Sequence, residues 1–347
     1  MTSVVDWPEP VVCVQTLSEN VNQIIPNQYI KPPLERPCLC TSDISIPVID
    51  FTGLITSPEV TMKQILKACH EWGFFQLVNH GVRKDLIDEA LETWREFFHE
   101  PMEVKQKYAN SPKTYEGFGS RVGVEKGAIL DWSDYYYVNN LPACHTKWPA
   151  HPPSLRDVME EYTKEFLRLG VALLKVLSIN LGLKENSLGN AFGGDIRAAL
   201  RATIYPKCPQ PDLTLGLSSH SDPGGLTFLL PDEQVPGLQI RKDDQWVIVK
   251  DVPNAIIVNI GDQVQILSNA IYKSVEHRVV VNPNKERVSL AFFCNPKNDM
   301  LIEPLSELVT SKTPALYLPM TFEDYRRFIR TKGPQGKFQL ESLKSPN

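Results

Sequence analysis

The feature that most constrains the fold is a series of short runs of β-forming residues in the second half of the chain. Pro, Gly, Asn and Asp separate the runs, which cover residues 201–206, 224–230, 237–240, 246–249, 255–260, 272–281 and 287–293. Many short strands at a spacing of about 8–12 residues are typical of a double-sheet or barrel domain. The pattern therefore predicts a mainly β fold for this part of the 347-residue chain.

Segments with a helical pattern flank these runs. Helices are predicted over 61–69, 85–98, 155–183 and 321–331, and two early strands over 46–51 and 73–78. The longest helical segment has apolar side chains at helical spacing, which predict a face buried in the core: Met159, Tyr162, Phe166, Leu169, Leu173, Leu177 and Leu181. Segment 110–150 is irregular and rich in glycine and aromatic residues, so we expect it to form a wall of a pocket.

These changes of pattern divide the chain into four parts. Residues 1–45 are rich in proline and polar residues and are expected to form an extended N-terminal arm. A mixed helical and strand domain is predicted over 46–195, the β domain over 196–310, and a C-terminal helix and tail over 311–347. The predicted fold class is mainly β with flanking helices.

Charge and cysteine content narrow the classes of function. The chain has 36 basic and 41 acidic residues and no basic run, which argues against nucleic acid or an anionic membrane as a partner. No secretory signal is recognisable, and no uncharged apolar run reaches the roughly 18 residues of a membrane-spanning helix. An odd number of cysteines without a CxxC pair predicts reduced thiols in a cytoplasmic protein; they are Cys13, Cys38, Cys40, Cys69, Cys144, Cys208 and Cys294. No oligomeric state is predicted.

Three residues have the types and spacing of a metal site. His220 and Asp222 stand two positions apart, so on a strand their side chains share one face. A further imidazole, His277, follows 55 residues after Asp222. Two imidazoles and a carboxylate are the ligands of non-haem iron(II) in its facial triad, and zinc accepts the same set. Alone, a His-x-Asp pair is more typical of a polar surface than of a metal site.

A candidate anion receptor follows on the next predicted strand. Arg287 and Ser289 begin ten residues after His277 and are again two positions apart. A guanidinium fork and a hydroxyl on one face can receive the carboxylate of a small dicarboxylic acid. An arginine buried without such a partner would be costly. The β domain therefore offers three metal ligands and one anion receptor.

The ordered set of motifs resembles the plant 2-oxoglutarate-dependent dioxygenases. The resemblance extends from about residue 46 to 335 and includes Gly73–Gly81 and Tyr205–Pro209. It implies a distorted double-stranded β-helix, also called a jelly roll or cupin-like core, that uses Fe(II), 2-oxoglutarate and O2, with ascorbate as reductant. It also implies that Arg287, Ser289 and Tyr205 hold 2-oxoglutarate, with Thr203 as a fourth residue at that site. Many relatives have Asn where this chain has Thr203, so the affinity for the cosubstrate is expected to differ.

Within that family, the chain most resembles the jasmonate-induced oxygenases. The shared segments are Trp7–Pro10, Thr114–Gly117, Asp131–Tyr136, Val258–Gln263 and Phe328–Pro334. The resemblance implies hydroxylation of jasmonic acid at C-12, which lowers active jasmonate in plant defence signalling. It further implies that Arg201, Arg326 and Arg330 clamp the carboxylate of the substrate, while Phe293 and Phe322 form an apolar wall. Arg326 and Arg330 are four positions apart on the predicted C-terminal helix and so share one face.

Three other interpretations remain open at this stage. The same chemistry could act on a flavonoid or another specialised metabolite, which would not need three arginines. A non-catalytic small-molecule-binding protein is a second possibility, although the complete ligand set argues against it. A zinc hydrolase is a third, but the chain has no HExxH motif to supply a general base.

Overall fold

The computed structural model describes residues 6–10, 12–20, 24–37, 45–142, 146–232 and 234–345. Cys38, Cys40 and Cys144 lie outside the described residues, as do both ends of the predicted N-terminal arm. The other four cysteines are free thiols. None of the described helices has the length and apolar character needed to span a bilayer.

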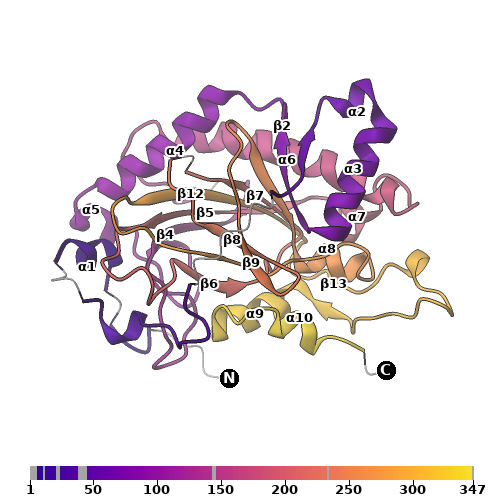
Figure 1. Cartoon of the computed structure of the whole chain (residues 1–347). Coiled ribbons are helices and arrows are strands. Elements are labelled where there is room, and N and C mark those ends of the chain that lie inside the picture. Colours follow the sequence, from indigo (N-terminus) through magenta and orange to yellow (C-terminus); the bar gives the residue numbers. More distant parts are fainter. Residues whose placement is uncertain are drawn as a thin grey trace.

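A large mixed sheet forms the centre of the molecule (Figure 1). In spatial order its strands are β1 (Val48–Asp50), β2 (Phe74–Val78), β10 (Ile256–Ile260), β7 (Leu226–Leu230), β12 (Arg287–Asn295), β5 (Arg197–Tyr205), β4 (Asp134–Leu141) and β3 (Gly117–Gly119). The pair β1 and β2 is parallel, and the other neighbours are antiparallel. Segments far apart in the sequence therefore meet within one sheet.

A smaller antiparallel sheet packs against the large one. Its strands are, in order, β6 (Leu217–His220), β11 (His277–Val279), β8 (Leu238–Lys242) and β9 (Gln245–Ile248). Phe74 and Ile257 of the large sheet share a buried cluster with Ile240 of β8 and Val247 of β9. Two sheets with an apolar layer between them are the arrangement expected of a double-stranded β-helix. A short pair of strands, β13 (Leu301–Ile302) and β14 (Met320–Thr321), lies apart from both.

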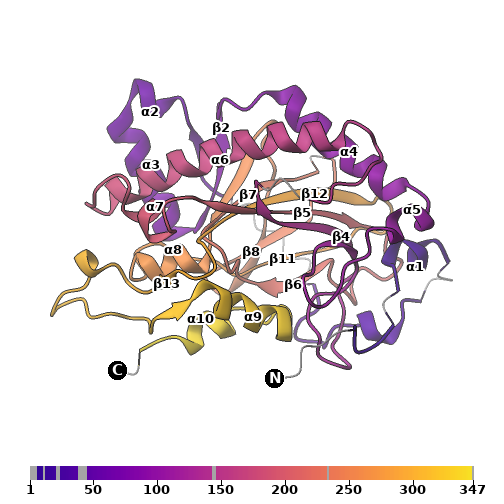
Figure 2. The same cartoon turned by 180° about the vertical axis from the view of Figure 1, so that it is seen from behind.

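Helices cover the outer face of the large sheet, as Figure 2 shows for α4 and α6. The buried side chains of α6 include Tyr162 and Phe166, which contact Phe292 of β12. Because side chains alternate along a strand, Phe292 faces the helix while Arg287 and Ser289 face the space between the sheets. The α6 contacts thus fix which face of β12 is available for a site.

The helices have the following bounds. Those of the N-terminal half are α1 (Val14–Asn20), η1 (Asn27–Tyr29), α2 (Gly53–Thr56), α3 (Pro58–Glu71), α4 (Lys84–His99), α5 (Met102–Gln106), α6 (Leu155–Asn180) and α7 (Ser187–Ala191). Those of the C-terminal half are α8 (Asp262–Leu267), η2 (Ser306–Leu308), α9 (Phe322–Lys332) and α10 (Phe338–Ser342). In both views α9 and α10 lie beside β6, on the side of the sheets opposite α4 and α6.

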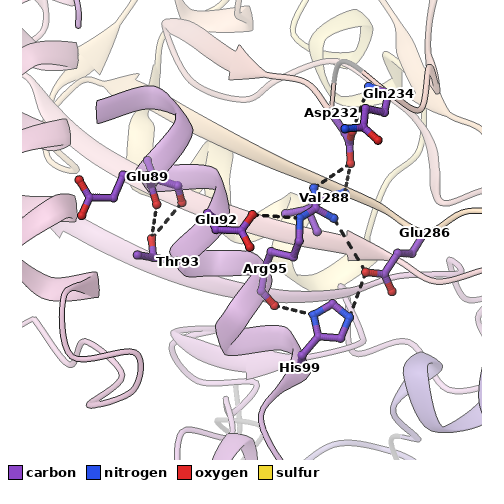
Figure 3. A network of polar contacts seen from close by, with 10 residues as sticks. Glu89, Glu92, Thr93, Arg95, His99, Asp232, Gln234, Glu286 and Val288 are labelled. Carbon is purple, nitrogen blue, oxygen red and sulfur yellow. Dashed lines mark hydrogen bonds and ion pairs between the residues drawn. The ribbon is translucent and has the colours of Figure 1, made fainter. Parts of the chain in front are cut away.

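Polar contacts tie α4 to the beginning of β12 (Figure 3). Arg95 Nη2 lies 3.1 Å from Asp232 Oδ2, which also accepts a hydrogen bond from the Val288 backbone N–H at 3.3 Å. His99 Nε2 lies 3.0 Å from Glu286 Oε1. Since Asp232 is buried, the Arg95 contact compensates a carboxylate that would otherwise be costly to desolvate. The network holds the first residues of β12 against the helical layer.

The predicted fold class is confirmed, but three segments differ from the prediction. Segment 110–150 contains β3 and β4 rather than irregular structure alone. Within the predicted strand 272–281, only β11 (His277–Val279) is a strand, because the backbone before it makes hydrogen bonds to other segments. Lys273 N donates to Cys69 O at 3.0 Å, and Ser274 N donates to Gln265 Oε1 at 2.7 Å. The predicted arm also contains α1 and η1. The four-part division of the chain stays a prediction.

Candidate metal and substrate site

The structure brings His220, Asp222 and His277 together between the sheets. His220 is the last residue of β6 and pairs directly with His277, the first residue of β11. One ligand atom from each residue lies within 4.8 Å of the other two. The strand expected to carry both His220 and Asp222 ends at His220, so Asp222 stands in the irregular segment that follows. Its side chain nevertheless reaches the same point.

Hydrogen bonds orient the two imidazoles. His220 Nδ1 lies 2.8 Å from Ser218 O, and His277 Nδ1 lies 3.1 Å from Val275 O. A carbonyl oxygen can only accept a hydrogen bond, so each Nδ1 carries a proton and each Nε2 presents its lone pair when neutral. Both Nε2 atoms lie 3.6 Å from Asp222 Oδ1. This tautomer and orientation suit metal ligation.

Two residues that the sequence analysis did not identify hold the carboxylate. Thr227 Oγ1 donates to Asp222 Oδ2 at 2.5 Å, and Asn259 Nδ2 donates to the same oxygen at 2.8 Å. They stand directly opposite each other on β7 and β10. With Oδ2 satisfied in this way, Oδ1 remains directed at the imidazoles. The sequence did contain a signal for them, because each is the single polar residue of an otherwise apolar strand.

The protonation states also suit a cation. Burial raises the pKa of Asp222, but the neighbouring imidazoles of His277 and His220 outweigh it and hold that pKa well below its usual value. Burial and the neighbouring His220 lower the pKa of His277 to about 4. For His220, burial lowers the pKa, but Asp222 outweighs it and the net shift is upward. The site is therefore an anionic carboxylate beside two imidazoles, and a bound metal would displace any proton from His220.

The four predicted cosubstrate residues lie on one face of β5 and β12. The register places Arg287 opposite Tyr205 and Ser289 opposite Thr203. The Arg287 guanidinium carbon lies 5.1 Å from the centroid of the Tyr205 ring. Among the described residues, no hydrogen-bond partner exists for Arg287 Nε and Nη1, although both atoms are buried. Buried guanidinium donors without a partner fit a carboxylate ligand.

A cavity of about 180 Å³ adjoins His220 and Asp222. The three predicted substrate arginines line it, together with both predicted phenylalanines. The expected pocket wall from segment 110–150 is present as Tyr115, Val122, Tyr135 and Tyr137. The four cosubstrate residues are not among its lining. The predicted substrate residues therefore share a cavity with His220 and Asp222, and the predicted cosubstrate residues lie outside the lining of that cavity.

The three arginines approach the cavity from two elements. Arg201, on β5, lies over the Tyr135 ring, with its guanidinium carbon 4.3 Å from the ring centroid. Arg326, on α9, donates from Nη1 to Asn298 Oδ1 at 3.0 Å, and burial lowers its pKa. Arg330, one turn later, lies 6.0 Å from the centroid of the Tyr115 ring. Within the described ranges, Arg201 Nε and Arg326 Nη2 are buried without a hydrogen-bond partner.

The amino-acid sequence matches two family models and several known proteins. Residues 196–296 match the family model of the 2OG-Fe(II) oxygenase superfamily, and residues 46–168 match that of the non-haem dioxygenase in morphine synthesis N-terminal region. Jasmonate-induced oxygenase 2 of Arabidopsis thaliana is 58% identical, over 98% of this chain and 95% of that protein. Flavonol synthase 1 of Crocosmia x crocosmiiflora is 39% identical, over 94% and 99%.

Solved structures agree with the sequence matches. A crystal structure of JOX2 in complex with 2OG, Fe and JA superposes with a TM-score of 0.93 at 59% identity, covering 98% of this chain and 100% of that one. A rice dioxygenase for auxin oxidation superposes with a TM-score of 0.73 at 25% identity, covering 87% and 100%.

Proposed function

Because the chain belongs to the 2OG-Fe(II) oxygenase superfamily and, within it, to the jasmonate-induced oxygenases, we propose that it hydroxylates jasmonic acid at C-12. The enzyme is a dioxygenase that uses Fe(II), 2-oxoglutarate and O2. The proposal concerns its substrate, the position of hydroxylation and the roles of individual residues.

The observation that carries the proposal is the set of arginine donors in the cavity beside the metal ligands. Arg201 and Arg326 each present a buried nitrogen that has no partner in the described part of the chain. Leaving a buried charged donor unpaired costs about 1–3 kcal/mol or more, so a ligand that supplies an acceptor is favoured. A carboxylate matches the guanidinium fork in both charge and geometry. This supports an anionic substrate.

The rest of the cavity suits an apolar body behind that carboxylate. Phe293, from β12, and Phe322, at the start of α9, line it together with three tyrosines and Phe328. A carboxylate held by Arg201, Arg326 and Arg330 would fix one end of the substrate and leave its apolar chain to reach toward His220 and Asp222. The protein's own contribution is then to orient the substrate and to exclude water from the reacting carbon.

We further propose that His220, Asp222 and His277 bind Fe(II). When bound, the iron activates O2 at the expense of 2-oxoglutarate, which supplies the oxidising power for hydroxylation. Arg287 and Ser289 would hold the distal carboxylate of 2-oxoglutarate, with Tyr205 contributing its hydroxyl. Thr203 lies beside them on β5 and has a shorter side chain than the Asn of many relatives.

A cytoplasmic location is part of the same proposal. The free thiols of Cys13, Cys69, Cys208 and Cys294 support it, since a reducing compartment preserves such cysteines.

The test of this function is product analysis with jasmonic acid and methyl jasmonate side by side. Mass spectrometry should detect 12-hydroxyjasmonic acid from the acid and little product from the ester, which lacks the charge that the arginines require. Equal turnover of acid and ester would refute the carboxylate clamp. Turnover of a flavonoid but not of jasmonic acid would refute the substrate and leave the dioxygenase chemistry in place.

A further inference from the structure

The segment Trp7–Pro10 contacts Tyr115, which lines the cavity, and Arg121, which is hydrogen-bonded to the cavity residue Tyr135. The Trp7 ring meets the Tyr115 ring edge to face, with centroids 5.4 Å apart and an interplanar angle of 83°. Glu9 Oε2 lies 3.0 Å from Arg121 Nη1 and accepts a second hydrogen bond from Gly127 N at 3.3 Å. Both contacts join residues more than a hundred positions apart, so they dock the arm on the wall.

The first contact leads to Arg330. The hydroxyl of Tyr115 donates to the backbone carbonyl of Arg330, and the Arg330 guanidinium lies over the Tyr115 ring. Tyr115 lines the cavity and has a positive φ of 60°, a conformation that a tyrosine adopts only when its surroundings impose it. The Trp7 ring is one of those surroundings. Trp7 therefore supports the ring on which Arg330 rests.

The second contact leads to Arg201. Arg121 is buried, and its backbone carbonyl accepts a hydrogen bond from the Tyr135 hydroxyl at 2.7 Å. The Tyr135 ring in turn lies beneath the Arg201 guanidinium. Glu9 supplies the carboxylate that compensates Arg121, because the other donors of that side chain go to the backbone carbonyls of Gly123 and Glu125. Loss of the Glu9 charge would leave a buried cation without a counter-ion.

We propose that Trp7 and Glu9 are positioning residues for the substrate carboxylate, acting through Tyr115 on Arg330 and through Arg121 and Tyr135 on Arg201. Neither residue lines the cavity, so neither touches the substrate. The inference rests on the proposed function, in which these arginines bind the carboxylate. It assigns to the N-terminal segment a role in substrate affinity and in selection of an acid over its ester.

The experiment compares Trp7→Ala and Glu9→Gln with the wild-type full-length protein. Each variant should raise KM for jasmonic acid by about tenfold, an effect of the size expected for residues coupled through direct contacts. The kcat for jasmonic acid and KM for 2-oxoglutarate should stay unchanged, because the metal ligands and Arg287 are not part of the network. The ratio of kcat/KM for jasmonic acid to kcat/KM for its methyl ester should fall by about the same factor as the KM for the acid rises.

Two controls make the test specific. Trp7→Phe keeps an aromatic edge for Tyr115 and should restore KM to near the wild-type value. Glu19→Gln removes the same charge from an exposed position on α1 and should have no effect. An unchanged KM for jasmonic acid in Trp7→Ala and Glu9→Gln, or a parallel loss of kcat and of affinity for 2-oxoglutarate, would overturn the inference. A wild-type protein that neither binds nor converts jasmonic acid would instead refute the proposed function itself.

Discussion

Removal of the Thr227 hydroxyl should weaken metal binding without changing any metal ligand. Thr227 Oγ1 donates to Asp222 Oδ2, and both residues are buried. Thr227→Val has nearly the same shape but no donor, so the surrounding strands can stay in place. Asp222 Oδ2 would then keep a single partner, Asn259 Nδ2 at 2.8 Å. The carboxylate would be both less stabilised and freer to turn away from the imidazoles.

The size of the effect follows from the kind of hydrogen bond that is lost. A hydrogen bond to a charged acceptor contributes about 1.5–3 kcal/mol. Since about 1.4 kcal/mol corresponds to a factor of ten in an equilibrium constant, the metal should bind roughly ten- to a hundredfold more weakly. Outer-sphere partners of metal ligands typically have effects of about this size. Thr227→Ser keeps the hydroxyl and should retain most of the affinity.

Anaerobic titration of the metal-free protein measures this directly. The dissociation constant for Fe(II), or for Co(II) followed by its visible absorption, would be compared among wild type, Thr227→Val and Thr227→Ser. Thermal melting without metal checks that the valine variant is folded. A folded valine variant that binds the metal as tightly as wild type would refute the reasoning, since the hydroxyl would then play no part in holding Asp222.

Further predictions concern the other parts of the site. His277→Ala should abolish turnover of 2-oxoglutarate, and near-normal turnover in a folded variant would contradict the metal assignment. Arg287→Ala should raise KM for 2-oxoglutarate sharply, because loss of one buried charge-assisted pair costs about 2–5 kcal/mol; an unchanged KM would place the carboxylate elsewhere. Thr203→Asn should remain active with equal or modestly better affinity for 2-oxoglutarate, whereas an inactive variant would reveal another role for Thr203. Arg326→Ala with Arg330→Ala should depress jasmonate turnover and leave metal binding intact, as measured by the same titration.

The sequence predicted those features that depend on spacing along one strand or helix. The alternation of Arg287 and Ser289 placed them on one face of a strand, and the structure has both facing the space between the sheets. Arg326 and Arg330 were predicted on a helix, and α9 presents both to the cavity. In each case the rule is local, since the period of the element decides which side chains share a face.

Features that depend on contacts between distant segments were not predicted. Thr227 and Asn259 hold Asp222 only because β7 and β10 are neighbours in the large sheet, which no local pattern specifies. The strand β4 was also missed, although Tyr135 and Tyr136 are good β-formers, because the polar and glycine-rich residues around them dominated the segment. Its position beside β5 is what brings Tyr135 beneath Arg201.

The pairing of β5 with β12 keeps the proposed cosubstrate residues and the substrate residue Arg201 on one face of the large sheet. Arg201, Thr203 and Tyr205 alternate along β5, and the antiparallel register sets Thr203 opposite Ser289 and Tyr205 opposite Arg287. A slip of one residue in this pair would turn one strand's whole set of side chains toward the helices. The aromatic contacts of Phe292 with α6 oppose such a slip, because the slip would expose an apolar face and bury charged groups in its place. The same packing that stabilises the outer face of the sheet therefore keeps both sets of polar residues aligned on its inner face.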